Sequence, residues 1–242
     1  MKKVSIITPT PEIITSVMQN SIVVKAKNNN IVDFEIINLR DYSDKKYKKV
    51  DDNPYGGGAG MVMMAEPLFK AIDDLLKKMD SDNNFKIIYP NPQGKTWDHN
   101  KALSFSSSNE NLIFICGHYK GIDERVIEKY VTDEYSLGDY VISNGELSSL
   151  VIIDSIVRLM PGVLNHISSA QTDSFYNNLL DAPYYTNPRE LDGMKVPDVL
   201  LSGDHKKIKS WKNKNRKSRT MINRPDLWNR YINENKSEVR NE

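Results

Sequence analysis

The stretch Cys116-Gly117-His118-Tyr119-Lys120-Gly121-Ile122-Asp123-Glu124-Arg125 joins the apolar run Leu112–Cys116 to a segment with helical spacing over Ile122–Val131. A short apolar run that ends at a glycine-containing turn is typical of a buried strand. Similar runs and one more helical pattern occur earlier: Val4–Ile7, Ile31–Leu39, Phe85–Tyr89, and a helix opened by Pro67 with Leu68, Ile72, Leu75, Leu76 and Met79 on one face. Strands that alternate with helices predict an α/β fold with a mostly parallel sheet.

A further segment, Leu147–Met160, is apolar nearly all round and ends at Pro161-Gly162. Its apolar residues surround the helix axis instead of forming one stripe, which predicts a helix buried on several sides. A subunit interface would supply part of that cover. The next segment, Asn165–Thr172, is polar and without periodicity, so it is interpreted as a linker.

Composition and charge restrict the class of protein. With 39% hydrophobic residues, a packed core is expected. One cysteine excludes a disulfide framework and indicates a reducing compartment. The N-terminus lacks a signal-peptide core and no apolar stretch reaches membrane length, so a cytoplasmic protein without a membrane segment is expected.

Positive charge gathers at the C-terminal end. From His205 to Glu242 there are 12 Lys/Arg and 4 Asp/Glu, a net charge of +8, whereas the whole chain carries +1. The other 204 residues therefore carry −7. A basic end on an acidic body is typical of contact with a polyanion, although a solvated helical surface explains the charge equally well.

Several familiar sites are not supported. Gln93-Gly94-Lys95-Thr96 resembles the end of a phosphate-binding loop, but Tyr89 stands where that motif needs its first glycine. No Gly-x-Gly-x-x-Gly follows a strand, which argues against a dinucleotide site. The four histidines are scattered, so no metal site is expected, and Cys116 is interpreted as a core residue.

Three glycine-rich segments are the informative ones: 51–61, 116–125 and 137–146. Glycine lets the backbone approach a ligand closely or turn with positive φ. The three loops either converge on one small molecule or are ordinary tight turns. The residues alone leave both readings open.

These segments, in this order, resemble the bacterial tRNA (guanine-N1)-methyltransferase family of the SPOUT class. The similarity runs over nearly the whole chain and includes Tyr89–Gly94, Asp154–Leu164, Asp173-Ser174-Phe175, Tyr185-Thr186, Val196–Gly203 and Trp211. The resemblance implies a mostly parallel sheet with a deep trefoil knot and a small helical C-terminal domain. It also implies a cofactor-binding and dimerisation domain over 1–164, an interdomain linker over 165–180 and a basic tRNA-binding domain over 181–242.

The resemblance implies that the chain transfers a methyl group from S-adenosylmethionine to guanine N1 in tRNA, at position 37 next to the anticodon. The cofactor would be held by Tyr89, Pro90, Asn91, Pro92, Gly117, Tyr119, Gly121, Leu137, Gly138, Asp139, Tyr140, Val141, Ile142, Asn144 and Gly145. A requirement for Mg²⁺ stays open. Two alternatives are a SPOUT-fold RNA-binding protein without activity and a SPOUT methyltransferase that acts on another RNA.

The family's general base matches Asp173 and its arginine matches Arg158. A carboxylate suits a base because guanine N1 carries a proton, and a guanidinium suits the charge that develops toward O6. Without the resemblance, Asp173 is explained as a helix N-cap and Arg158 as a partner of a helix dipole. The resemblance further implies a homodimer in which the base and the cofactor loops come from different subunits.

The chain departs from the family pattern at several positions. Lys120 stands where the family has glutamate, near the cofactor's charged end, and a cation there opposes cofactor binding. Asn144 replaces a glycine, and asparagine tolerates positive φ. Tyr184 and Asn187 replace a histidine and an arginine, which bears on RNA contacts, and Asn53 and Ala59 also differ.

Overall fold

The computed structural model describes residues 1–19, 22–78, 84–164 and 172–235. The chain forms two compact units, Met1–Asn165 and His166–Glu242. Met79, expected on the first long helix, and residues 165–171 of the expected linker lie outside the described residues.

A five-stranded, all-parallel sheet forms the centre of the first unit. Its strand order is β2-β1-β6-β5-β7. The strands are β1 (Lys2–Thr8), β2 (Val32–Asn38), β5 (Phe85–Thr96), β6 (Asn111–Ile115) and β7 (Asp133–Ser136). Ile6 and Ile7 of β1 point to opposite faces and both are fully buried, as a sheet covered on two sides requires. The predicted α/β fold with a mostly parallel sheet is confirmed.

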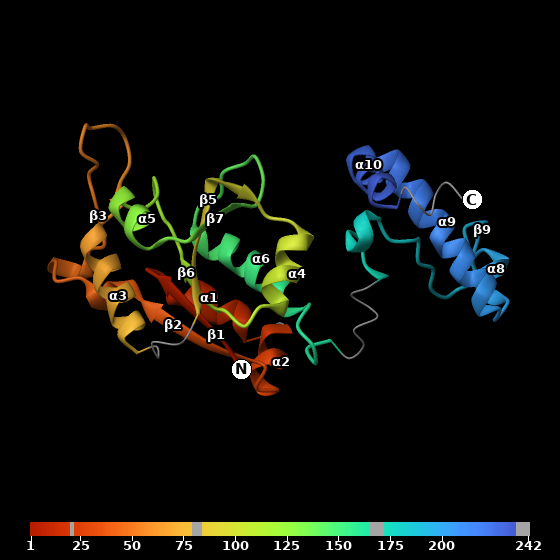
Figure 1. Cartoon of the computed structure of the whole chain (residues 1–242), viewed down its shortest axis with the longest axis horizontal. Helices are drawn as coiled ribbons and strands as arrows, with labels where there is room; N and C mark the ends of the chain where they lie inside the picture. Colours follow the sequence, from red (N-terminus) through yellow and green to blue (C-terminus); the bar gives the residue numbers. More distant parts are fainter. Residues whose placement is uncertain (20–21, 79–83, 165–171, 236–242) are drawn as a thin grey trace. The chain divides into compact units, whose positions relative to one another are not determined.

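Helices cover both faces of this sheet (Figure 1). One face packs against α1 (Pro11–Met18), α2 (Ile22–Asn28), α4 (His99–Ser107) and α6 (Gly145–Val157). The other packs against α3 (Ala65–Lys77) and α5 (Glu124–Tyr130). Smaller elements complete the unit: the 3-10 turns η1 (Leu39–Tyr42) and η2 (Lys46–Lys48), and the hairpin strands β3 (Asp51–Asp52) and β4 (Val62–Met63).

Two expectations for the first unit need correction. The strand predicted over Phe85–Tyr89 continues to Thr96, because after a register shift Lys95 and Thr96 pair with β7. The apolar segment 147–160 forms α6, but this helix ends at Val157, before Pro161. One side of α6 is exposed at Leu147 and Val151, so the helix is not buried all round within one chain.

The second unit is built around two helices, of which the longer, α9, is strongly basic. It contains η3 (Tyr176–Asn178), β8 (Glu190–Leu191), β9 (Met194–Lys195), α8 (Asp198–Leu201), α9 (His205–Asn223) and α10 (Pro225–Glu234). The Thr220 hydroxyl of α9 accepts a hydrogen bond of 2.8 Å from the backbone N–H of Leu180. The Asn178 amide donates to Glu234 of α10 at 2.7 Å. The chain that enters this unit is thus fixed to both helices.

Among the helices of the described ranges, none combines the length and the apolar character that a membrane crossing needs.

Candidate functional site

A pocket of about 400 Å³ lies in the first unit, beside the loops that follow β6 and β7. Its wall comes from three segments far apart in the chain: 89–93, 117–122 and 135–145. In parallel sheets, ligands bind beyond the carboxyl ends of the strands, and a pocket of this size suits a small-molecule ligand. Two of the three glycine-rich segments therefore meet one pocket, together with Tyr89–Gln93.

All the residues expected to bind a cofactor line this pocket, except Asp139, whose neighbours Gly138 and Tyr140 both line it. The pocket also has lining residues that the sequence did not single out as binding residues: Gln93, His118, Lys120, Ile122, Glu124, Ile127, Tyr135, Ser136, Ser143 and Ser148. Several of these lie inside the glycine-rich segments, where they could have been found. Tyr135, Ser136 and Ser148 give no signal in the sequence.

Tyr89 forms part of the pocket wall and lies against two glycines. A Cβ on Gly117 would come within 2.9 Å of the Tyr89 ring, and one on Gly121 within 3.1 Å of its hydroxyl. Gly121 also has φ +118°, a conformation that side chains disfavour. Burial raises the pKa of Tyr89 to about 12, so its hydroxyl stays neutral and can donate a hydrogen bond.

Two loops cross in direct backbone contact at Gly117 and Gly145. The N–H of Gly145 donates to the carbonyl of Gly117 at 2.7 Å, and His118 pairs with Asn144 in an antiparallel bridge. A Cβ on Gly145 would lie 2.4 Å from the Gly117 nitrogen, so no other residue fits there without backbone movement. This crossing joins two walls of the pocket.

Asn144 does not need the positive φ considered for it. Its φ is −155°, and its side chain accepts a hydrogen bond of 3.2 Å from the backbone N–H of Leu147. Asparagine at this position is therefore the N-cap of α6, a role in which it is favoured.

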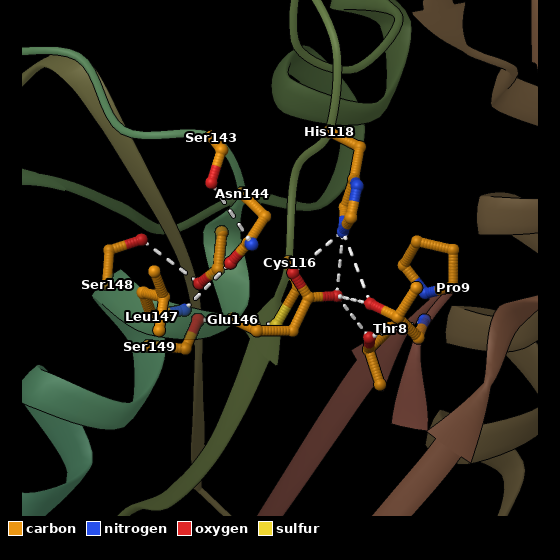
Figure 2. A network of polar contacts seen from close by, with 12 residues as sticks. Thr8, Pro9, Cys116, His118, Ser143, Asn144, Glu146, Leu147, Ser148 and Ser149 are labelled. Carbon is orange, nitrogen blue, oxygen red and sulfur yellow. Dashed lines mark hydrogen bonds and ion pairs between the residues drawn. The ribbon is translucent and has the colours of Figure 1, made fainter. Parts of the chain in front are cut away.

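Next to the crossing lies the fully buried carboxylate of Glu146 (Figure 2). It accepts hydrogen bonds from Thr8, from the Thr10 hydroxyl at 2.8 Å and from His118 Nε2 at 2.7 Å. Burial alone would raise the pKa of Glu146, but the hydrogen bonds from His118, Thr8 and Thr10 outweigh it and hold the pKa below its ordinary value. The group is therefore an ionised carboxylate inside the protein.

Acidic groups lie at the side of the pocket formed by Asn91. The Asn91 amide donates to Glu134 and its carbonyl oxygen accepts from the Gln93 N–H at 2.6 Å. Burial, and after it the charge of Glu124, raise the pKa of Glu134. Glu124 itself lines the pocket. Two neighbouring carboxylates favour a cationic ligand here.

Lys120 is an exposed residue of the pocket rim, and its stem lies against the glycine-rich loop 56–60. A Cβ on Gly60 would come within 3.0 Å of Lys120 Cγ. The backbone N–H of Lys120 donates to the Met61 carbonyl at 3.0 Å. The third glycine-rich segment therefore supports the pocket loop from outside, without lining the pocket.

The two expected catalytic residues belong to different units of the chain. Arg158 is the C-cap of α6 and is half-buried. This position agrees with the catalytic role and equally with a favourable interaction with the helix dipole. Asp173 lies before η3, whose N-cap is Phe175, so capping of η3 does not explain Asp173. The segment is held locally, since Ser174 Oγ accepts from the Asp181 N–H at 2.9 Å.

The structure gives Tyr184 a local role. Its hydroxyl donates to Asp181 at 2.7 Å, and the Lys212 ammonium lies 5.4 Å from its ring centroid. The hydrogen bond to Asp181, with the nearby charge of Asp173 as a smaller cause, raises the pKa of Tyr184. Tyr184, which stands where the family has a histidine, therefore lies near Asp173, the expected base. Nothing in the structure explains the substitutions at Asn53, Ala59 and Asn187.

Comparison with known proteins adds a match over nearly the whole chain. The family described as tRNA (Guanine-1)-methyltransferase TrmD matches residues 1–230. The chain belongs to this family. Curated relatives named tRNA (guanine-N(1)-)-methyltransferase from Bacillus cereus strain AH820 and from Bacillus anthracis strain CDC 684 are each 48% identical over 225 residues, which is 93% of this chain and 91% of theirs.

Membership in the tRNA (guanine-1)-methyltransferase family makes the chain an enzyme that methylates guanine N1 in tRNA. The family implies S-adenosylmethionine as the methyl donor and tRNA as the substrate. An RNA-binding protein without activity and a methyltransferase for another RNA are therefore not supported.

Proposed function

We propose that the pocket between the segments 89–93, 117–122 and 135–145 is the S-adenosylmethionine site of this methyltransferase. The observation that carries the proposal is the convergence of these loops on one cavity of about 400 Å³, with Glu124 in its wall. The donor fits in size, and its sulfonium and ammonium charges fit the acidic side of the pocket. The absence of a Cβ at Gly117 and Gly121 lets the Tyr89 side chain pack directly against the backbone of the pocket wall.

In this proposal the donor supplies an electrophilic methyl group. The chain supplies a general base and a positively charged side chain. The Asp173 carboxylate accepts the proton of guanine N1, which leaves a lone pair on N1. The bond from N1 to the methyl carbon would form as the bond between that carbon and the donor's sulfur breaks, and the thioether S-adenosylhomocysteine would be released. The Arg158 guanidinium stabilises the negative charge that develops toward O6. The target guanine is that of position 37, next to the anticodon.

The chain path proposed for the pocket is a deep trefoil knot. Two close backbone contacts support it: a Cβ on Gly94 would lie 2.4 Å from the backbone of Glu134, and one on Gly145 would lie 2.4 Å from that of Gly117. Segments whose backbones pass this close to each other are compatible with a knotted chain, a feature that is rare among folds.

A homodimer with shared active sites completes the proposal. Tyr140, Val141 and Ile142 are exposed beside the pocket, and Leu147 and Val151 are exposed on α6. Arg158, at the end of α6, continues the helical spacing of Leu147 and Val151. An exposed apolar patch of this kind suits a second subunit, which would bring its Asp173 to the pocket of the first.

The basic second unit is proposed as the tRNA-binding domain over 181–242, with 1–164 as the donor-binding domain and 165–180 as the linker. A shallow hollow on α9 is lined by Lys206, Lys209, Ser210, Asn213, Lys214 and Lys217. Lysines on one helix face suit the phosphates of RNA.

The described residues contain no group of three or more His, Cys, Asp or Glu side chains that could hold a metal ion. A requirement for Mg²⁺ is tested by measuring methyl transfer in EDTA and then with Mg²⁺ restored.

Mixing two inactive variants tests the shared site. Asp173→Asn removes the base, and Gly145→Ala forces the two pocket loops apart, so this variant is nearly inactive when the donor concentration is well below its dissociation constant. If the two come from different subunits, an equal mixture re-formed from subunits recovers about one quarter of the wild-type activity, since half the dimers are mixed and each has one intact site. A mixture as inactive as its components would contradict the shared site.

A further inference from the structure

Glu146 is a buried acid that the methyl-transfer chemistry does not use. Its side chain has no exposed surface, yet it carries a charge in the interior. Both carboxylate oxygens lie close to His118 Nε2, at 2.9 and 2.7 Å, and one also accepts from Thr8 and Thr10. A buried charge with this many partners needs a reason, because removing a charge from water costs free energy.

The carboxylate ties together three segments that are distant in the chain (Figure 2). Thr8 is the last residue of β1, His118 lies in the loop after β6, and Glu146 lies in the first turn of α6. Figure 2 shows the His118 ring and the Thr8 side chain reaching the same carboxylate from two elements. One side chain therefore fixes the relative positions of a strand end, a loop and a helix start.

Two of these three segments are pocket walls. His118 lines the pocket, and Gly145, the residue before Glu146, also lines it. The Gly145 N–H to Gly117 carbonyl bond of 2.7 Å lies directly beside the His118–Glu146 contact. His118 and Glu146 are each one residue from this backbone contact. A change in the hydrogen bonds of the Glu146 carboxylate therefore acts directly on the contact between Gly117 and Gly145.

A contribution to stability alone explains this arrangement poorly. Apolar residues often replace a buried ion pair without loss of stability, whereas a buried network fixes one geometry among several. The nearby Cys116 Sγ and Ser149 Oγ, 3.4 Å apart, are also buried and polar, but neither residue lines the pocket.

We propose that Glu146 is a positioning residue for the methyl donor: its carboxylate, bound by Thr8, Thr10 and His118, holds the 117–118 and 144–145 walls at the separation that the donor requires. This inference rests on the assignment of the pocket to S-adenosylmethionine. Glu146 touches no reacting group and acts through the backbone of its neighbours.

Binding of S-adenosylhomocysteine, measured by calorimetry on the full-length protein, tests this role without any methyl transfer. Glu146→Gln keeps the size of the side chain but loses the charge and one acceptor, so its dissociation constant should rise by about tenfold or more. Ser149→Ala is the matched control, since it removes a buried hydroxyl one turn further along α6. It should bind within about twofold of wild type, as a site without shared partners behaves independently.

A double-mutant cycle separates the network from a general loss of stability. His118→Leu should lose about as much affinity as Glu146→Gln, and His118→Gln, which keeps an N–H donor, should recover most of that loss. The double variant Glu146→Gln with His118→Leu should bind no worse than either single variant. If Glu146→Gln does not fold, Thr10→Val at the half-buried edge of the network replaces it, with an expected loss of about threefold.

Hydrogen exchange of the Gly145 amide provides the second readout. It should accelerate in ligand-free Glu146→Gln and stay unchanged in Ser149→Ala. Binding within about twofold of wild type and unchanged exchange in Glu146→Gln would overturn the positioning role. Normal binding in Gly145→Ala, whose Cβ meets the Gly117 nitrogen, would instead overturn the assignment of the pocket.

Discussion

The donor pocket and the basic face of α9 are built in opposite ways. The pocket depends on backbone: Gly117 and Gly145 touch, and the loop turns at Gly121 with positive φ. The α9 face depends on charged side chains along one hollow, where Lys206, Lys209 and Lys214 are exposed and Lys217 is half-buried. A backbone site should fail when a single Cβ is added, whereas a charged surface should weaken gradually as charges are removed. The predictions below, from the largest effect to the smallest, test this difference.

Asp173→Asn should separate chemistry from binding most sharply. Loss of the base should lower the methyl transfer rate by about a hundredfold or more, the usual contribution of general base catalysis. Binding of S-adenosylmethionine should stay near normal. Single-turnover rates and calorimetry measure the two effects. Asp192→Asn, in the exposed turn between β8 and β9, is the matched control. Near-normal turnover in Asp173→Asn would refute the assignment of the base.

Gly145→Ala should disrupt the backbone site. The added Cβ would lie 2.4 Å from the Gly117 nitrogen, so the two loops must separate. Overpacking of this kind costs about 1–3 kcal/mol, which corresponds to roughly a tenfold or greater loss of donor affinity. Gly193→Asn, with open space around its Cβ position and φ +76°, should leave donor binding unchanged. Equal affinity in Gly145→Ala and wild type would contradict the assignment of this pocket to the donor.

Replacing Lys206, Lys209, Lys214 and Lys217 by glutamine should weaken tRNA binding while donor binding persists. Each lost phosphate contact should also reduce the dependence of log affinity on log salt by about 0.7–0.9. Filter binding at several salt concentrations measures both. A control with the same charge change uses exposed lysines of the first unit, Lys27, Lys46, Lys48 and Lys77. If both sets change the slope equally, α9 is only one part of a general charged surface.

Lys120→Glu should have the smallest effect. The substitution removes a cation at the pocket rim and adds an anion, which favours a cationic donor. Because Lys120 is exposed, water screens the change, and about a two- to fivefold gain in affinity for S-adenosylmethionine is expected. Lys120→Gln should give an intermediate value. Weaker donor binding in Lys120→Glu would show that the lysine contributes to holding the ligand or the loop 56–60.

The sequence predicts the fold where hydrophobic patterns are strong. The four apolar runs became strands, and the pattern after Pro67 became α3. The strand β7 was missed, because Asp133 and Glu134 interrupt its apolar character and it lies at the edge of the sheet. The extension of β5 to Thr96 was missed because proline and glycine at 90–94 indicate a turn, whereas pairing with β7 after a register shift continues the strand.

The glycine-rich segments and the family resemblance predicted part of the site. The titratable residues of the sequence predicted less of it. Glycines at 117, 121 and 145 were compatible with ligand-binding loops and with ordinary tight turns, and the structure shows that these loops line one pocket. The buried Glu146 network gave no sequence signal, because Thr8, His118 and Glu146 are brought together only by the parallel sheet. Arg158 and Asp173 depend on the resemblance for their roles.

Nucleoside analysis of a methylated tRNA tests the central claim most directly. The protein is incubated with S-adenosylmethionine and a tRNA transcript with guanine at position 37, and a second transcript carries adenine there. Digestion and mass spectrometry should find N1-methylguanosine in the first transcript, mapped to position 37, and none in the second. Methylation of both transcripts, methylation of another atom, or none in either would contradict the account.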